Sequence, residues 1–239
     1  MICRYEIGVT RYMIGNAAAD TLLTSERTSM STTVNDPHNV ENTPGPGAAA
    51  DPTAGFADPA PLGLAAFALT TFLLSLFNAG IAPESLEKSV LPLALFYGGV
   101  AQLIAGLFEF RKNNTFGATA FVSYGAFWLG FAAFVQFVEP ALPEADHKTA
   151  TGLFLLGWAI FTLYMFIASL RTNGTLIAVF GLLFLTFLFL VLGTLAGISA
   201  LATVGGILGI LTAIAAWYGS FAVVTNSTYG RQVLPTAPR

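Results

Sequence analysis

The sequence predicts an all-α, polytopic membrane protein folded as a six-transmembrane-helix bundle. Composition points to a membrane protein, because 55% of the 239 residues are hydrophobic and only 10% are charged, whereas an ordinary soluble domain carries roughly 25% charged residues. The spacing of the charges is the second observation, since it leaves apolar stretches long enough to cross a bilayer. A charge at the bilayer centre costs about 2.5 to 3.5 kcal/mol, so these stretches can be counted as spans.

The uncharged intervals determine the number of helices. A span needs about 20 apolar residues, and four intervals within residues 59–170 supply one span each. The fifth interval, 172–230, would be roughly 88 Å long as one helix, against a hydrocarbon core of about 30 Å, so it must fold back once. Glycines from Gly193 to Gly206 mark the expected turn. The predicted spans are 61–81, 89–109, 116–138, 151–170, 175–197 and 204–225.

The sequence also predicts three regions and an orientation. Residues 1–56 carry too few large apolar side chains to offset the entropy of ordering, which predicts a disordered N-terminal tail. Residues 57–226 form the transmembrane domain and residues 227–239 a short C-terminal tail. The loops and tail on the side of the termini carry five Lys and Arg residues, against two on the other side. The positive-inside rule therefore predicts a cell-membrane protein with both termini in the cytoplasm.

Composition excludes several functional classes. Basic residues are too few and too scattered to neutralise phosphates, so nucleic acid is not an expected partner. Cys3 is the one cysteine, which excludes an intramolecular disulfide and a multi-thiolate metal site, and neither a metal nor a cofactor is expected. The two histidines, His38 and His147, lie outside the spans, and no lysine or pair of acids lies mid-span. We therefore do not expect an enzyme.

Glu109 is the acidic residue at the inner end of the second predicted span, three residues before Lys112. Side chains three residues apart on a helix are neighbours, so this spacing indicates an interfacial ion pair. Because no ionisable residue lies in the middle of a span, we expect a narrow path through the bundle that is lined by uncharged groups.

Uncharged polar side chains recur in the predicted spans. Hydroxyl, amide and phenol groups can replace water around a small solute in a narrow path. They can also bond the carbonyl four residues earlier or join helices, and the sequence leaves both interpretations open. These residues are Thr70, Thr71, Ser75, Asn78, Tyr97, Gln102, Thr119, Ser123, Tyr124, Gln136, Thr212, Tyr218 and Ser220.

Small residues form stripes along several spans. A GxxxG spacing occurs at Gly193/Gly197 and again at Gly205/Gly209, and the second span contains a further stripe that includes Gly106. Such stripes permit close approach of helices. The sequence does not decide whether this packing is within the chain or between copies.

The first span has a sharply defined start. Asp58 is a suitable N-cap and Pro59 fits the first helical position, where its missing N–H costs nothing. Free N–H groups and the positive end of the helix dipole would then face the inner side. This arrangement predicts either a capture point for a carboxylate or a rigid helix start.

The residues at this start carry a family resemblance. The motif is Asp58-Pro59-Ala60-Pro61-Leu62-Gly63-Leu64, followed by Phe67. It resembles the signature Asn-Pro-Ala-Pro-Leu-Gly-Leu of the succinate/acetate permease family, the YaaH-type acetate uptake transporters. Similar stretches follow at residues 96–102, 114–125 and 229–235, so the resemblance covers about residues 57–236. Asp58 departs from the pattern, because the family has Asn at this position.

The resemblance implies a homohexamer in the lipid membrane, with one path through each six-helix protomer. It implies transport of acetate and, in some members, succinate, usually linked to protons. The family's constriction falls on Phe67, Tyr124 and Leu183, and its size-selecting small residue falls on Ala216. Thr70, Thr71, Tyr97 and Gln102, which are among the polar side chains named above, are further candidate substrate contacts.

Physical chemistry narrows the form in which the solute passes. An ionised carboxylate buried without a partner is costly enough to take up a proton, so acetic acid, or acetate accompanied by water, is the expected species at the constriction. A hexameric channel for small neutral solutes, of the urea-channel type, would use the same uncharged path and remains the alternative. A receptor is not expected, because the inner loops are too short to form an output surface.

Overall fold

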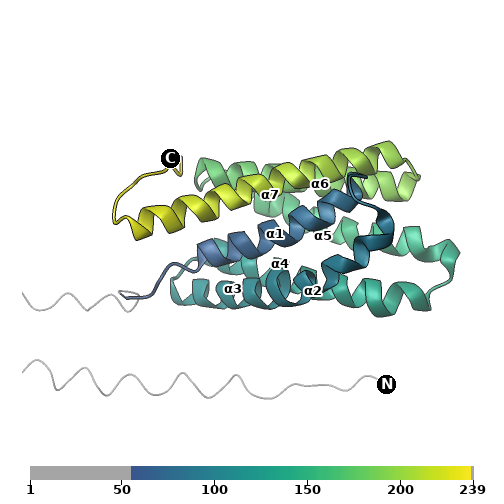
Figure 1. Cartoon of the computed structure of the whole chain (residues 1–239), viewed down its shortest axis with the longest axis horizontal. Helices are drawn as coiled ribbons and strands as arrows, with labels where there is room; N and C mark the ends of the chain where they lie inside the picture. Colours follow the sequence, from purple (N-terminus) through teal and green to yellow (C-terminus); the bar gives the residue numbers. More distant parts are fainter. Residues whose placement is uncertain (1–54, 238–239) are drawn as a thin grey trace, which may run out of the picture. The chain divides into compact units, whose positions relative to one another are not determined.

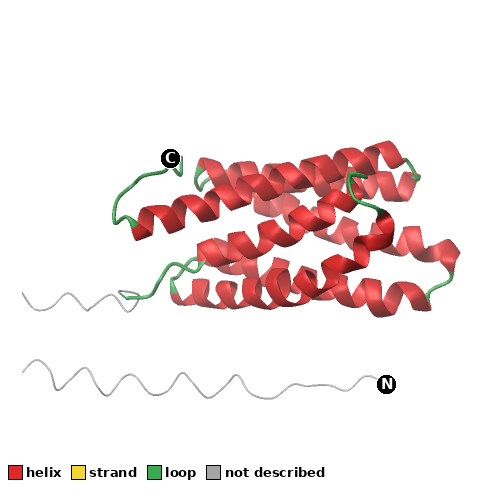
Figure 2. Cartoon of the chain, in the orientation of Figure 1, coloured by secondary structure: helices red, strands yellow, loops and turns green. Residues whose placement is uncertain are grey.

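The computed structural model describes residues 55–237, and within this range the chain forms helices joined by short turns (Figures 1 and 2). Six helical segments are long and apolar enough to cross a membrane. The predicted six-helix bundle is therefore confirmed. The predicted disordered tail, residues 1–56, lies outside the described residues apart from Gly55 and Phe56.

The helices follow the predicted spans closely. The second and third spans are composite, and short 3₁₀ turns at Glu139–Ala141 and Glu144–Asp146 connect the third to the fourth. The second span consists of a 3₁₀ segment Glu84–Val90, α2 Leu91–Leu95, a π segment Phe96–Ala101 and α3 Gln102–Arg111. The others are α1 Ala60–Asn78, α4 Thr115–Ala133 with a π segment Phe134–Val138, α5 His147–Ser169, α6 Gly174–Ala196 and α7 Ser199–Thr228.

Capping residues explain several of these boundaries. The side chain of Asn114 accepts the N–H of Gly117 at 3.0 Å at the start of α4, and Asn173 does the same for Leu176 at the start of α6. Both are standard N-caps, because each satisfies an N–H without a helical partner. Gly197, with a φ of 67°, ends α6 in the left-handed conformation that glycine adopts without strain. The turn therefore lies inside the predicted glycine cluster.

The start of α1 differs by one residue from the prediction. The helix begins at Ala60, so Pro59 is the capping residue and not the first helical residue. Asp58 still accepts a backbone N–H, that of Ala60, at 3.1 Å. The Asp58 carboxylate thus accepts an exposed N–H at the helix start, although Asp58 lies one residue before the capping position.

Glycines bring the helices close together within the chain. A Cβ added to Gly206 of α7 would meet the backbone of Asn78 and Ala79 at the end of α1, and one added to Gly209 would meet Ser75. Figure 1 shows α7 beside both α1 and α6, and these are among the most extensive helix pairs. At these positions the small residues therefore pack against helices of the same chain. The sequence had left open whether they pack within the chain or between copies.

Candidate functional site

A cavity of about 340 Å³ lies at one end of the bundle. This is the end where α1, α4 and α6 begin and where α3 and α7 finish, and the cavity walls come from these five helices. We call it the terminal end, because the described chain begins and ends there (Figure 1). The rim of the cavity contains the polar residues Asp58, Lys112, Asn114, Asn173 and Thr236, all at least partly exposed.

The cavity floor is formed by the three residues predicted as a constriction. Phe67, Tyr124 and Leu183 are the deepest lining residues of α1, α4 and α6 respectively. They lie seven, nine and nine residues from the helix starts, which at 1.5 Å per residue is about 10 to 14 Å below the rim. Their exposed fractions are 5%, 3% and 3%. These residues therefore meet at one depth, where the cavity closes.

Tyr124 is hydrogen-bonded to a helix that does not line the cavity. Its ring centroid is 5.8 Å from that of Phe67, and its hydroxyl lies 2.9 Å from the Oγ1 of Thr162 on α5. Both hydroxyls are buried. Sequence reasoning missed Thr162, although a hydroxyl in the middle of an apolar helix is a signal for a polar contact of this kind.

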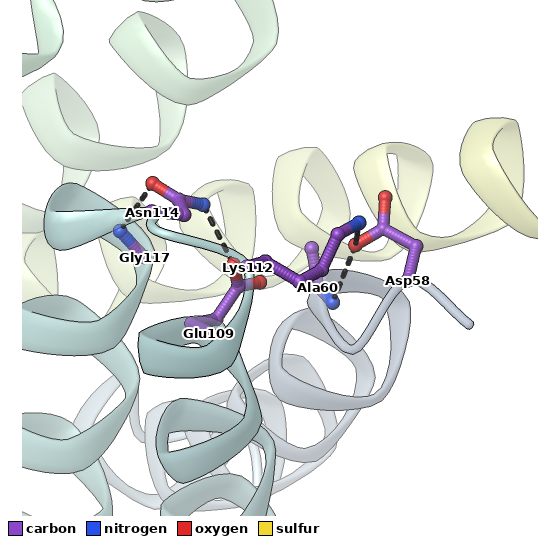
Figure 3. A network of polar contacts seen from close by, with 6 residues as sticks. All are labelled: Asp58, Ala60, Glu109, Lys112, Asn114 and Gly117. Atoms are coloured by element: carbon purple, nitrogen blue, oxygen red, sulfur yellow. Dashed lines mark hydrogen bonds and ion pairs between the residues drawn. The ribbon is translucent and has the colours of Figure 1, made fainter. Parts of the chain in front are cut away.

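The structure corrects the expectation for Glu109 (Figure 3). Lys112 Nζ lies 3.3 Å from Asp58 Oδ1, so the predicted Glu109–Lys112 ion pair is wrong. Glu109 Oε2 instead accepts a hydrogen bond from Asn114 Nδ2 at 2.7 Å. The Glu109 side chain is 1% exposed and lines the cavity. The expectation of a path without ionisable groups is therefore also wrong.

Two buried side-chain oxygens of cavity-lining residues have no hydrogen-bond partner within the described residues. They are Oε1 of Glu109 and Oε1 of Gln102. The two residues lie seven positions apart, which places them two turns apart on the same face of α3. Gln102 is the deepest lining residue of α3, at the level of the floor. Both oxygens are acceptors, and each would be satisfied by a solute or water that donates a proton.

Some residues of the signature motif line the cavity, and others pack against neighbouring helices. Ala60 and Leu64 line the cavity. A Cβ added to Gly63 would lie 2.7 Å from the ring of Phe121, so the glycine lets α4 approach α1 closely. Leu62 is 42% exposed and faces away from the core.

The remaining motif residues hold the helix start in place. The carbonyl of Pro61 accepts a hydrogen bond from the hydroxyl of Ser220 on α7 at 2.7 Å. Pro59 is buried. The motif thus fixes the position of α1 against its neighbours and also supplies part of the cavity wall.

Four other predicted site residues do not line the cavity. Thr70 donates its hydroxyl to the carbonyl of Ala66 at 3.0 Å, the bond to the preceding turn that was its alternative interpretation. Thr71 is buried, and its hydroxyl has no partner within the described residues. Tyr97 lies in the π segment. Ala216 is fully buried in the same core cluster as the floor residues, and it lies one turn deeper than Gly219, which lines the cavity.

The C-terminal tail supplies part of the rim, which the sequence did not suggest. Asn226 near the end of α7 accepts the N–H groups of Val233 and Leu234 and donates to the carbonyl of Leu234. The tail then continues to Ala237, whose carbonyl accepts the N–H of Gly174 at 2.9 Å. Thr236 consequently faces the cavity between α6 and α7.

Comparison with known proteins gives consistent matches. The chain is 41% identical over 179 residues to the succinate-acetate/proton symporter SatP of Escherichia coli K12, covering 75% of this chain and 94% of that protein. It is 43% identical over 186 residues to the ammonia transport outward protein 2 of Saccharomyces cerevisiae, covering 76% of this chain and 66% of that protein, slightly under two thirds of its length. The solved structure of the bacterial acetate channel SatP matches with a TM-score of 0.71 and 41% identity, covering 76% of this chain and 99% of that one.

The match at family level extends over all of the described residues. Residues 40–238 match the GPR1/FUN34/yaaH family. This range contains the six membrane helices, the cavity and the signature motif at the start of α1. The chain is a multi-pass membrane protein that belongs to the GPR1/FUN34/yaaH family.

Proposed function

We propose that the chain transports acetate across the membrane, with succinate as a second substrate, and that this transport is linked to protons. The observation that carries the proposal is the cavity of about 340 Å³, which has a polar rim and closes on Phe67, Tyr124 and Leu183. The substrates named for the relatives in E. coli and in the solved structure support the choice of acetate. No catalytic residues are needed for this function, and we propose that the chain is not an enzyme.

The charges of the cavity suit a small carboxylate only near the rim. Among the described residues, Lys112 is the one basic residue that lines it, and its ammonium group is already paired with Asp58. Deeper in the cavity the described lining offers no positive charge. Burying an ionised carboxylate there is costly, so the solute reaches the floor as the acid or with water.

Selectivity by size would arise at the floor and just beyond it. Leu183 closes the α6 side of the cavity, and Ala216 lies buried one turn deeper along α7. We propose that these two side chains set the largest solute that passes. Thr70, Thr71 and Tyr97 would then contact solute on the far side of the floor.

The proposed setting is a homohexamer in the cell membrane. The five helices that enclose the cavity belong to one chain, which is consistent with one path per protomer. Exposed apolar side chains such as Ile160 and Phe221 face outward from the bundle and suit lipid or a neighbouring copy. With the termini in the cytoplasm, the cavity would open toward the cytoplasm.

Uptake of radiolabelled acetate by proteoliposomes, with and without an imposed pH gradient, tests the proposal. We expect uptake above that of protein-free liposomes and an increase when the acetate side is acidic. Urea uptake in the same vesicles tests the alternative of a neutral-solute channel. Urea passage without acetate passage would contradict the proposal.

A further inference from the structure

Glu109 is an ionisable side chain in the wall of the cavity, and the proposed function so far gives it no task. We propose that Glu109 is the proton-binding group of the transport cavity, so that a solute carboxylate and Glu109 together take up one proton when the solute binds. This inference rests on the proposed function, because it assumes that the cavity admits a carboxylate. It adds a residue and a stoichiometry to that function.

Hydrogen bonds fix which oxygen of Glu109 can receive the proton. Asn114 Oδ1 accepts the N–H of Gly117 at 3.0 Å, so the amide nitrogen of Asn114 must face Glu109. That nitrogen donates to Oε2 at 2.7 Å, which makes Oε2 an acceptor (Figure 3). Oε1 is buried and has no partner within the described residues. A proton therefore has a place on Oε1.

Close packing holds this arrangement in position. A Cβ added to Gly117 would lie 2.5 Å from Asn114 Nδ2 and 2.9 Å from the carboxyl carbon of Glu109. Neither side chain can move toward α4, because the backbone of Gly117 occupies that side. The carboxyl group is thus held at the cavity wall near the rim.

The charged groups around Glu109 leave it without a positive partner of its own. Asp58, from the segment before α1, and Lys112, at the end of α3, act on it electrostatically with opposite signs, and they are paired with each other. From α4 its neighbour is the neutral Asn114. The described parts of α6, α7 and the C-terminal tail that line the cavity contribute no charged side chain.

Two carboxylates in one water-poor cavity repel each other, and the repulsion is relieved when one of them is protonated. In this proposal, Glu109 and the solute are both carboxylates before binding. On binding, one proton enters from solution and is held on Oε1 of Glu109, from which it can pass to the solute. If the solute leaves as the acid, the proton leaves with it and Glu109 returns to the carboxylate. If the solute leaves as the anion, the proton stays on Oε1.

Gln102 supplies a second unpartnered acceptor oxygen, deeper in the cavity than Glu109. Its unpartnered Oε1 lies at the level of the floor, two turns deeper than Glu109. An acceptor oxygen is satisfied by the O–H of a carboxylic acid and not by a carboxylate. The acid form therefore suits the floor, so solute and proton can cross it together.

Counting protons during acetate binding tests the inference. Isothermal titration calorimetry of the purified protein, repeated at pH 7 in buffers of different ionisation enthalpy, gives the number of protons taken up per acetate. A carboxylic acid is almost fully ionised in water at this pH, so we expect about one proton per acetate in the unmodified chain. Glu109→Gln should bind acetate with proton uptake near zero, because the amide Nε2 can donate to the anion directly.

The matched control is Glu87→Gln, which removes a carboxylate from the 3₁₀ segment at the other end of the bundle, outside the cavity. Its proton count should equal that of the unmodified chain. The inference is wrong if Glu109→Gln still takes up about one proton, or if the unmodified chain takes up none. A chain that neither binds nor transports acetate would instead contradict the proposed function.

Infrared difference spectroscopy of the unmodified chain covers the case in which Glu109→Gln does not fold. Acetate labelled with ¹³C shifts the solute bands away from those of the protein carboxyl groups. We expect acetate to change the band of a protonated protein carboxyl. An unchanged protein carboxyl region would overturn the inference.

Discussion

At the scale of single residues, a few buried polar contacts decide how the cavity works. Tyr124 combines a ring that closes the floor with a hydroxyl that reaches Thr162 on α5. The sequence suggested a phenol that contacts solute, and the structure gives that phenol a protein partner. The two roles can be separated because the ring and the hydroxyl are removed by different substitutions.

Tyr124→Phe removes the hydroxyl and keeps the ring. We expect a loss of stability of about 1 to 3 kcal/mol, because Thr162 loses its buried partner. Adding Thr162→Val removes the second hydroxyl and should restore most of that stability. Denaturant unfolding in detergent measures both variants. We further expect acetate uptake in proteoliposomes to be reduced in Tyr124→Phe and to remain reduced in the double variant. Full uptake in the double variant would show that the Tyr124 hydroxyl serves only to contact Thr162 on α5.

Leu183→Ala tests the floor as a size filter. Removal of this buried side chain leaves a space that a packed bundle refills only in part, so succinate uptake should rise relative to acetate uptake. Leu185→Ala, on the exposed side of the same helix, is the control and should leave the ratio unchanged. Ala216→Gly should raise the ratio as well, provided that the path continues past the floor. An unchanged ratio of succinate to acetate uptake in Leu183→Ala would show that Leu183 is not part of the size filter.

At the scale of helices, charges and glycines were sufficient to predict the spans, because a bilayer tolerates few charges, four uncharged intervals have one span's length, and glycines mark the turn that divides the fifth into two. The sequence could not show that Lys112 pairs with Asp58 and leaves Glu109 to Asn114. A three-residue spacing favours a local pair, whereas the actual partners come from the residues just before α1 and α4. Such contacts between helices depend on their positions in space, which periodicity along one helix does not contain.

Close helix approach makes Gly206 a sensitive position. Gly206→Ala would push a methyl group into the backbone of Asn78 and Ala79, which cannot rotate away as a side chain could. We expect a loss of about 1 to 3 kcal/mol, typical of overpacking. Gly130→Ala on α4 is the control, since a Cβ there meets nothing within 4 Å, and it should be neutral or slightly stabilising. Equal thermal stability of the two variants in detergent would contradict the packing of α7 on α1.

At the scale of the whole molecule, the cavity makes the bundle asymmetric, because it opens at the terminal end and closes about 10 to 14 Å below the rim. The direction in which it opens therefore follows from the orientation of the chain in the membrane. From the excess of Lys and Arg on the side of the termini, we propose that this end lies in the cytoplasm.

Single cysteines in a Cys3→Ser background test this orientation. Ser85 and Ala145 are exposed in the turns at the far end of the bundle, and Gln232 is exposed in the tail at the terminal end. In intact cells, cysteines at positions 85 and 145 should react with a membrane-impermeant thiol reagent, and a cysteine at 232 should react only after permeabilisation. The reverse pattern would turn the cavity outward. A solute entering from outside would then meet Glu109 before the floor and Gln102, whereas the predicted orientation makes it cross the floor first and reach Glu109 on the way into the cytoplasm.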